Sequence, residues 1–194
     1  MANVKLSSRE LDLVCDAGII LTKNNIIAKV YELMGQLSEM YREELKTCPD
    51  TAITAILPKI SRGENYEGLP WVMLDYPRYF SANDHFAIRT FFWWGHFLSI
   101  SLLVKGKFAT GWQWDNLDAV LMKDWYLCCS TDAWQHHFRP DNYIEYCNFQ
   151  KDQVNNLPFI KLAKKIPVAE FELAQTYLQE AFLQIGQIIK KASN

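Results

Sequence analysis

The sequence predicts an α+β fold: an antiparallel sheet of about five to seven strands, covered on one face by two long amphipathic helices. Two observations carry this prediction. Apolar residues recur every three or four positions near both ends of the chain, as they do along one face of a helix. Strand-like segments fill the middle of the chain, between the two helices. This order argues against a doubly wound parallel sheet, and a length of 194 residues predicts a single domain over residues 1–194.

The N-terminal region predicts a short helix followed by a long one. Ser7 and Glu10 fit a capping box, and the short helix then runs to about Ala17, where Gly18 can stop it. The long helix is expected from about residue 22 to residue 46. Its apolar stripe consists of Ile26, Ile27, Val30, Leu33, Met34, Leu37, Met40 and Tyr41.

The C-terminal region predicts one more amphipathic helix. Pro167 suits the first helical position, Glu170 favours the positive end, and the helix is expected to run to about Lys191. Its stripe consists of Phe171, Ala174, Tyr177, Leu178, Ala181, Phe182, Ile185, Ile188 and Ile189. Each helix has one apolar face, so both must cover something in the middle of the chain.

The segment Ile88–Lys105 is the strongest strand signal, because it joins four consecutive aromatic residues to an alternating tail. A single strand of this length would be about 60 Å long, too long for a domain of this size. We therefore expect a hairpin in which Gly95-His96 forms a two-residue type II′ turn. This turn sets Trp94 opposite Phe97 and predicts a face that mixes aromatic rings with hydroxyl groups.

Weaker signals fill in the rest of the sheet. Strands are expected at 71–75, 125–130 and 159–166, a short helix at 115–123, and polar loops at 59–69 and 148–158. Segments 133–138 and 143–148 flank Arg139-Pro140-Asp141-Asn142, which favours a type I turn. They predict a second hairpin, with His136 opposite Glu145.

The composition of the chain argues against nucleic acid and membrane as partners. A net charge of −2 and a pI near 6.1 give no basic excess, so we expect no nucleic-acid partner. The small cationic cluster at Lys161, Lys164 and Lys165 is interpreted as a solvated edge. The run Phe91–Val104 is too short and too polar to cross a bilayer, and the N-terminus has no apolar signal segment. Five cysteines without a CxxC spacing are typical of a reduced protein, so a cytoplasmic location is expected.

The sequence gives no sign of a metal or cofactor. The adjacent His136 and His137 would point to opposite faces of a strand, and neither an HxH nor an HxxxH spacing occurs. The eight glycines are scattered and form no phosphate-binding loop. We therefore expect neither a metal ion nor a cofactor.

One candidate for catalysis is the expected pair of His136 and Glu145. A carboxylate beside an imidazole raises its proton affinity, and such a dyad could act as a general acid and base. The structural alternative is a pair that only stabilises the hairpin.

The second candidate is a binding site for an apolar or aromatic small molecule on the ring-bearing face of the first hairpin. Mostly apolar walls with a few hydroxyl groups are typical of small-molecule cavities. The predicted ligand-binding residues are Phe92, Trp94, His96, Phe97, Ser99, Ser101, Arg78 and Tyr76. The same rings could instead form core or the contact of a homodimer. A non-catalytic binding protein is thus the first hypothesis, and a hydrolase-like or proton-transfer enzyme and a homodimeric interaction protein are the alternatives.

Overall fold

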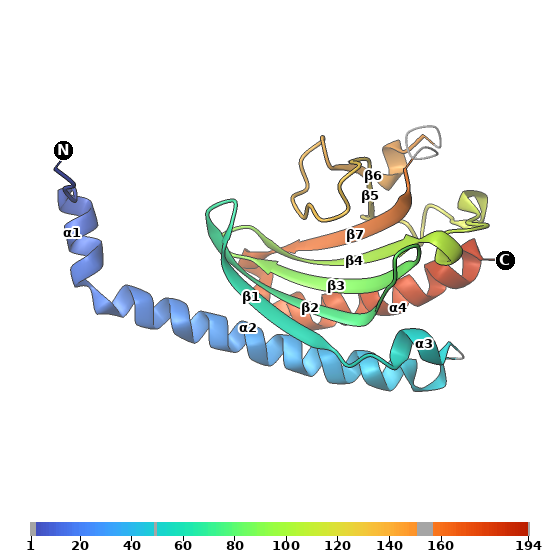
Figure 1. Cartoon of the computed structure of the whole chain (residues 1–194), viewed down its shortest axis with the longest axis horizontal. Helices are drawn as coiled ribbons and strands as arrows, with labels where there is room; N and C mark the ends of the chain where they lie inside the picture. The colour runs from blue at the N-terminus through green and yellow to red at the C-terminus, as the bar shows by residue number, and fades with distance from the viewer. Residues whose placement is uncertain (1–2, 49, 151–156, 194) are drawn as a thin grey trace.

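The chain forms a seven-stranded antiparallel sheet in the order β1-β2-β3-β4-β7-β5-β6 (Figure 1). The structure is a computed structural model that describes residues 3–48, 50–150 and 157–193. The strands are β1 (Lys59–Tyr66), β2 (Leu69–Phe80), β3 (His85–Trp93), β4 (Phe97–Lys105), β5 (Tyr126–Cys128), β6 (Tyr143–Glu145) and β7 (Phe159–Pro167). With long helices at both ends of the chain, this sheet confirms the predicted α+β fold.

Two long helices cover one face of the sheet. The α-helices are α1 (Ser8–Cys15), α2 (Ala17–Glu44), α3 (Thr51–Thr54) and α4 (Ala174–Ala192). Short 3-10 segments are η1 (Leu45–Thr47), η2 (Gly106–Phe108), η3 (Trp114–Asn116), η4 (Tyr146–Asn148) and η6 (Val168–Leu173). The predicted capping box of Ser7 and Glu10 is confirmed. Asp16 ends α1 and accepts a hydrogen bond from the Gly18 amide at 2.8 Å, so α2 begins earlier than expected and Gly18 lies inside it.

The two covering helices and the sheet meet at Tyr41. Its ring stacks on Phe182 of α4, with 3.9 Å between ring centroids and 5° between planes. Its hydroxyl group lies 3.2 Å from the Thr90 hydroxyl of β3. Burial raises the pKa of this phenol, so Tyr41 stays neutral. One side chain thus joins α2, α4 and the sheet, inside a core formed by alternate residues of the central strands.

Several local predictions are wrong. Residues 59–66 form the edge strand β1 rather than a loop, and β2 continues through Pro70 and Pro77. The register of β2 shifts between Asp75 and Arg78, and this bulge accommodates Pro77, which has no N–H for the ladder. Residues 115–123 form turns and part of a 3-10 segment, not a helix.

The C-terminal helix begins later than predicted. Pro167 is the last residue of β7 and pairs with Phe97, and η6 separates it from α4. The expected strand at 159–166 is confirmed as β7. Most of the expected loop at 148–158 lies outside the described residues.

The first hairpin exists, but its register differs from the prediction by one residue. Its loop has three residues, Trp94, Gly95 and His96, and the closing pair is Trp93 with Phe97. Gly95 has a φ of +74°, which glycine adopts without a steric penalty. With one more residue in the loop, each residue of β3 pairs with the neighbour of its predicted partner in β4. Residues predicted to share a face of the sheet therefore lie on opposite faces. The observed register puts Phe92 beside Leu98, under the helices.

The second predicted hairpin is wrong. The turn itself forms, since the Asn142 N–H donates to the Arg139 carbonyl at 2.9 Å, but residues 133–138 are not a strand. β6 pairs instead with β5, and Glu145 lies opposite Tyr126. Residues 129–142, here called the covering segment, lie on the sheet face opposite the helices (Figure 1).

Candidate functional site

The register of the first hairpin divides the predicted ligand-binding residues between two faces. Phe92 faces the helices, where its neighbours are core residues. Phe97 faces away from the helices and packs with Met73, Phe91 and Trp93. Ser99 and Ser101 share that second face, because they pair with Phe91 and Arg89. The single ring-and-hydroxyl face expected from the sequence is therefore not formed.

Trp94 and Phe92 nevertheless meet at a pocket of about 430 Å³ beside the tip of the hairpin, here called the Trp94 pocket. It lies between α2, the β3–β4 loop and η6, and it is lined by Ile26, Lys29, Phe92, Trp94, Gly95, Val168 and Phe171. The ring of Trp94 meets Phe92 edge-on, at 6.4 Å between centroids and 88° between planes. This volume is in the range of ordinary small-molecule sites.

Two backbone hydrogen bonds hold the walls of the Trp94 pocket. The Trp94 N–H donates to the Pro70 carbonyl at 3.0 Å, which ties the hairpin loop to the start of β2. The Val168 N–H donates to the His96 carbonyl at 3.2 Å, which ties η6 to the same loop. The pocket wall is therefore fixed by main-chain contacts rather than by exposed side chains.

The polar groups at the Trp94 pocket are donors. Lys29 is exposed on α2 and makes no ion pair with any residue in the described ranges. The indole N–H of Trp94 likewise makes no hydrogen bond within those ranges. An ammonium and an indole N–H beside apolar walls suit a ligand whose apolar body carries an acceptor.

Three further predicted ligand-binding residues lie outside this pocket. His96 stacks on Trp93 with 3.7 Å between ring centroids. The Arg78 Nε donates to the Leu57 carbonyl at 3.1 Å, so this guanidinium helps to hold the segment before β1. Tyr76 is buried in the core under the helices, where burial raises the pKa of its hydroxyl.

A charged cluster lies under the covering segment. Arg89 donates from Nε and Nη2 to the two carboxylate oxygens of Asp75, at 2.7 and 2.9 Å. Its Nη1 lies 3.4 Å from His136 Nε2. Burial, together with the charges of Lys161 and Arg89, holds the pKa of His136 well below its ordinary value of 6.5, so the ring is neutral at pH 7.

Lys161 belongs to the same cluster, so its interpretation as a solvated residue is wrong. Its side chain is buried, and Nζ donates to the carbonyls of Ala133 and Gln135 at 2.8 and 2.5 Å. Burial lowers the pKa of this ammonium to about 8. Lys161 thus attaches the covering segment to the sheet.

The structure does not bring His136 and Glu145 together. His136 lies against Arg89 and Phe91 of β3, whereas Glu145 ends β6, and β4, β7 and β5 lie between those strands. The exposed carboxylate of Glu145 accepts hydrogen bonds from Cys147 at 3.6 Å and Asn148 at 3.3 Å. The cross-strand geometry on which the catalytic hypothesis depended is absent.

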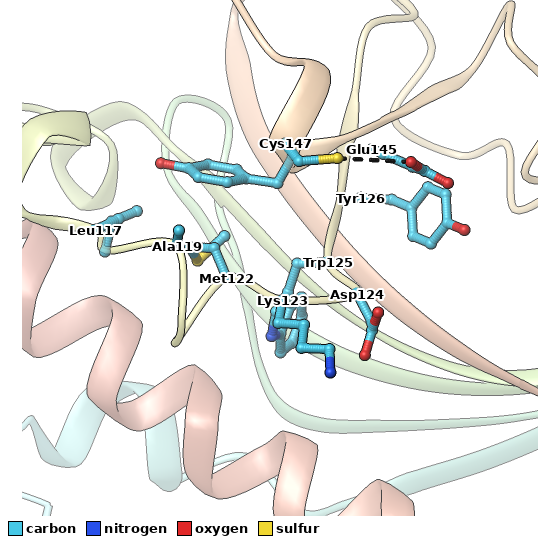
Figure 2. Close-up of a pocket in the computed structure, with 10 residues that line it drawn as sticks. Leu117, Ala119, Met122, Lys123, Asp124, Trp125, Tyr126, Glu145 and Cys147 are labelled. Carbon is cyan, nitrogen blue, oxygen red and sulfur yellow. Dashed lines mark hydrogen bonds between the residues drawn. The ribbon is translucent and has the colours of Figure 1, made fainter.

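Glu145 instead lines a separate pocket of about 460 Å³ (Figure 2). Its other lining residues are Leu117, Ala119, Met122, Lys123, Asp124, Trp125, Tyr126, Tyr146 and Cys147. Figure 2 shows Glu145 beside the ring of Tyr126, with the thiol of Cys147 directed at the carboxylate. Among the described residues that line this pocket there is no imidazole, so Glu145 is present here without the histidine expected to act with it.

The sequence did not predict the residues that complete the Trp94 pocket on one face of the sheet or the charged cluster on the other. Ile26, Val168 and Phe171 come from segments more than 60 residues before or after Phe92, so only the fold brings them to the Trp94 pocket. The buried pair of Asp75 and Arg89 had one signal, since Arg89 interrupts an otherwise apolar strand and a buried guanidinium needs a partner.

Among the described helices, none has the length and apolar character needed to cross a membrane. Comparison of the chain with known protein families, with curated proteins and with solved structures finds no match. The fold, the two pockets and the charged cluster therefore have to be interpreted from their own chemistry.

Proposed function

We propose that this protein is a non-catalytic binding protein for an apolar or aromatic carboxylic acid, which it takes up at the Trp94 pocket. The observation that supports the proposal is a pocket of about 430 Å³ in which Lys29 is the only charged residue among the described residues of the lining. Phe92, Trp94 and Phe171 offer rings to the apolar part of the ligand. The Lys29 ammonium and the Trp94 indole N–H are the donors proposed to hydrogen-bond to its carboxylate.

Trp94→Ala is expected to weaken binding of 2-naphthoate at least tenfold, as measured by isothermal titration calorimetry. Removing the indole takes away one aromatic wall of the pocket and one of its donors. A hydrophobic contact of this size contributes roughly 1.5–3 kcal/mol, which corresponds to at least a tenfold change in affinity. Trp134→Ala is the matched control, because Trp134 is an exposed ring on the other face of the sheet.

Lys29→Gln tests the contribution of the ligand's carboxylate separately from that of its apolar part. The proposal requires a loss of affinity for 2-naphthoate and little change for the neutral 2-naphthalenemethanol. Absence of binding by the unchanged protein at millimolar 2-naphthoate, or equal losses in the Trp94 and Trp134 variants, would contradict the proposal.

A second candidate function is a homodimeric interaction protein, and a projecting arm favours it. The arm consists of α1 and the first ten residues of α2, residues 8–26, and it extends beyond the sheet (Figure 1). α1 has no buried residue, and the buried stripe of α2 begins only at Ile27. The large apolar residues exposed along the arm are Leu11, Leu13, Val14, Ile19, Ile20, Leu21 and Ile26. An isolated helix as short as α1 is marginal in water, so a partner is expected.

Charge supports a second copy of this chain as that partner. Residues 8–16 carry Arg9 against Glu10, Asp12 and Asp16, a net charge of −2 (one positive, three negative). Residues 17–29 carry Lys23 and Lys29, a net charge of +2; Lys23 is already paired with Glu64 of β1, so Lys29 is the charge open to a second copy. In a two-fold arrangement, α1 of each copy can lie beside the start of α2 of the other, so opposite charges meet twice.

Ile20→Asp is expected to convert a dimer into a monomer in size-exclusion chromatography with light scattering. The substitution places a carboxylate on an already exposed position, so the fold of the body is unaffected while the apolar contact is lost. Val120→Asp is the control, because Val120 is equally apolar and lies outside the arm. A dimer with a weak interface has a dissociation constant on the order of 100 µM or below. A protein that stays monomeric at about 100 µM would therefore overturn this second candidate.

A further inference from the structure

A small space lies beside the charged cluster, on the sheet face under the covering segment, and the half-exposed ring of Trp134 forms part of its wall. Its volume is about 10 Å³, and its walls are Phe80, Ala87, Arg89, Ser101, Leu103, Ala133, Trp134, His136 and Lys161. A space of this size holds one water molecule or one monatomic ion. It is too small for phosphate, sulfate or a carboxylate.

The polar groups around this space have donors to spare. The Lys161 ammonium has three N–H groups, and two of them are used by the Ala133 and Gln135 carbonyls. Three of the five guanidinium N–H groups of Arg89 are accounted for by Asp75 and His136. The buried Ser101 hydroxyl makes no hydrogen bond to any residue in the described ranges.

Most of the acceptors around the space already receive a hydrogen bond. Both Asp75 oxygens accept from Arg89, and His136 Nε2 faces Arg89 Nη1. The Ala133 carbonyl accepts from Lys161. A water molecule here would bring two hydrogens, for which the Ser101 hydroxyl oxygen and the second lone pairs of the carbonyls remain as acceptors, whereas a monatomic anion brings no hydrogen and uses only the spare donors.

The balance of charge in the cluster also favours an anion. Arg89 is neutralised by Asp75, and His136 is neutral at pH 7. Lys161 forms no ion pair with any carboxylate in the described part of the chain. The cluster therefore holds one buried positive charge in excess, and a buried charge without a counterion is costly.

We propose that Lys161, Arg89 and Ser101 bind a single halide ion, chloride under physiological conditions, in the space beneath the covering segment. The ion neutralises the excess charge and accepts from all three side chains. Because Lys161 also donates to two carbonyls of the covering segment, the ion helps to hold that segment on the sheet.

The direct test is diffraction from crystals of the unchanged protein grown in sodium bromide, with data collected at the bromine absorption edge. An anomalous peak within hydrogen-bond distance of Lys161 Nζ and Arg89 Nη1 or Nη2 is the expected result. A well-ordered water without anomalous signal, or an empty space, would overturn the proposal.

Solution measurements test whether the ion matters for stability. The Tm is expected to rise by about 2–4 °C and then level off as chloride replaces gluconate at constant ionic strength. Lys161→Met and Ser101→Ala are expected to lose most of this chloride-specific rise, while Lys123→Met, an exposed lysine outside the space, retains it. An equal Tm in chloride and gluconate for the unchanged protein would count against the site even if the Lys161 variant failed to fold.

Discussion

Asp75→Asn is expected to lower the free energy of unfolding by about 3–5 kcal/mol, as measured by urea denaturation. The carboxylate of Asp75 receives two hydrogen bonds from Arg89, and the two side chains are only 11% and 15% exposed. Removing the charge leaves the guanidinium next to the Lys161 ammonium without its counterion. An uncompensated buried charge costs far more than the loss of an exposed ion pair.

Two controls separate this effect from a general loss of charge. Glu43→Gln breaks the ion pair with Lys46, in which the side chains are 67% and 66% exposed, and is expected to cost less than about 0.5 kcal/mol. The double variant Asp75→Leu with Arg89→Met removes both charges and is expected to recover much of the lost stability. If Asp75→Asn costs no more than Glu43→Gln, the pair does not hold this face of the sheet.

The long-range architecture was predictable because its signals are periodic. The stripe from Val30 to Tyr41 and the stripe from Leu178 to Ile188 each repeat over several turns, so the burial of one face does not depend on where the helix begins. β7 was predicted at 159–166 as well, although its apolar residues do not alternate strictly and most of the strand is buried.

The register of the first hairpin depended on a single loop residue. A glycine with positive φ fits both a two-residue and a three-residue loop, so Gly95 does not distinguish them. The choice is made by burial: the observed register puts Leu98, Ile100 and Leu102 on the same face as Phe92, under the helices. Local turn chemistry does not contain that information.

The sites were harder to predict than the sheet because they combine distant segments. Sequence reasoning named Trp94 and Phe92, which do line a pocket, but Lys29 and Phe171 reach it only through the packing of α2 and η6. His136 was named for a partner it does not meet, because a turn at 139–142 was taken to imply two paired strands. The segment before that turn folds over the sheet instead, where His136 contacts Arg89.

Phe182→Ala is expected to destabilise the protein by about 3–5 kcal/mol in the same denaturation experiment. Phe182 is buried on α4, and its ring stacks on Tyr41 of α2, whose hydroxyl group meets Thr90 of β3. Truncation therefore opens a cavity where both covering helices meet the sheet. The surrounding side chains are closely packed and relax only in part, so the lost contacts are not recovered.

The neighbouring residue supplies the control for this truncation. Leu183 is on the same turn of α4 but is 42% exposed, so Leu183→Ala removes apolar atoms without opening a cavity and is expected to cost less than about 1 kcal/mol. Near-equal losses in the two variants would mean that α4 contributes helix propensity rather than packing, which would contradict the role of Tyr41 and Phe182 as the joint between the two helices and the sheet. Phe removes more atoms than Leu when cut to Ala, but a severalfold difference between adjacent positions on one helix also requires that only one of them faces the core.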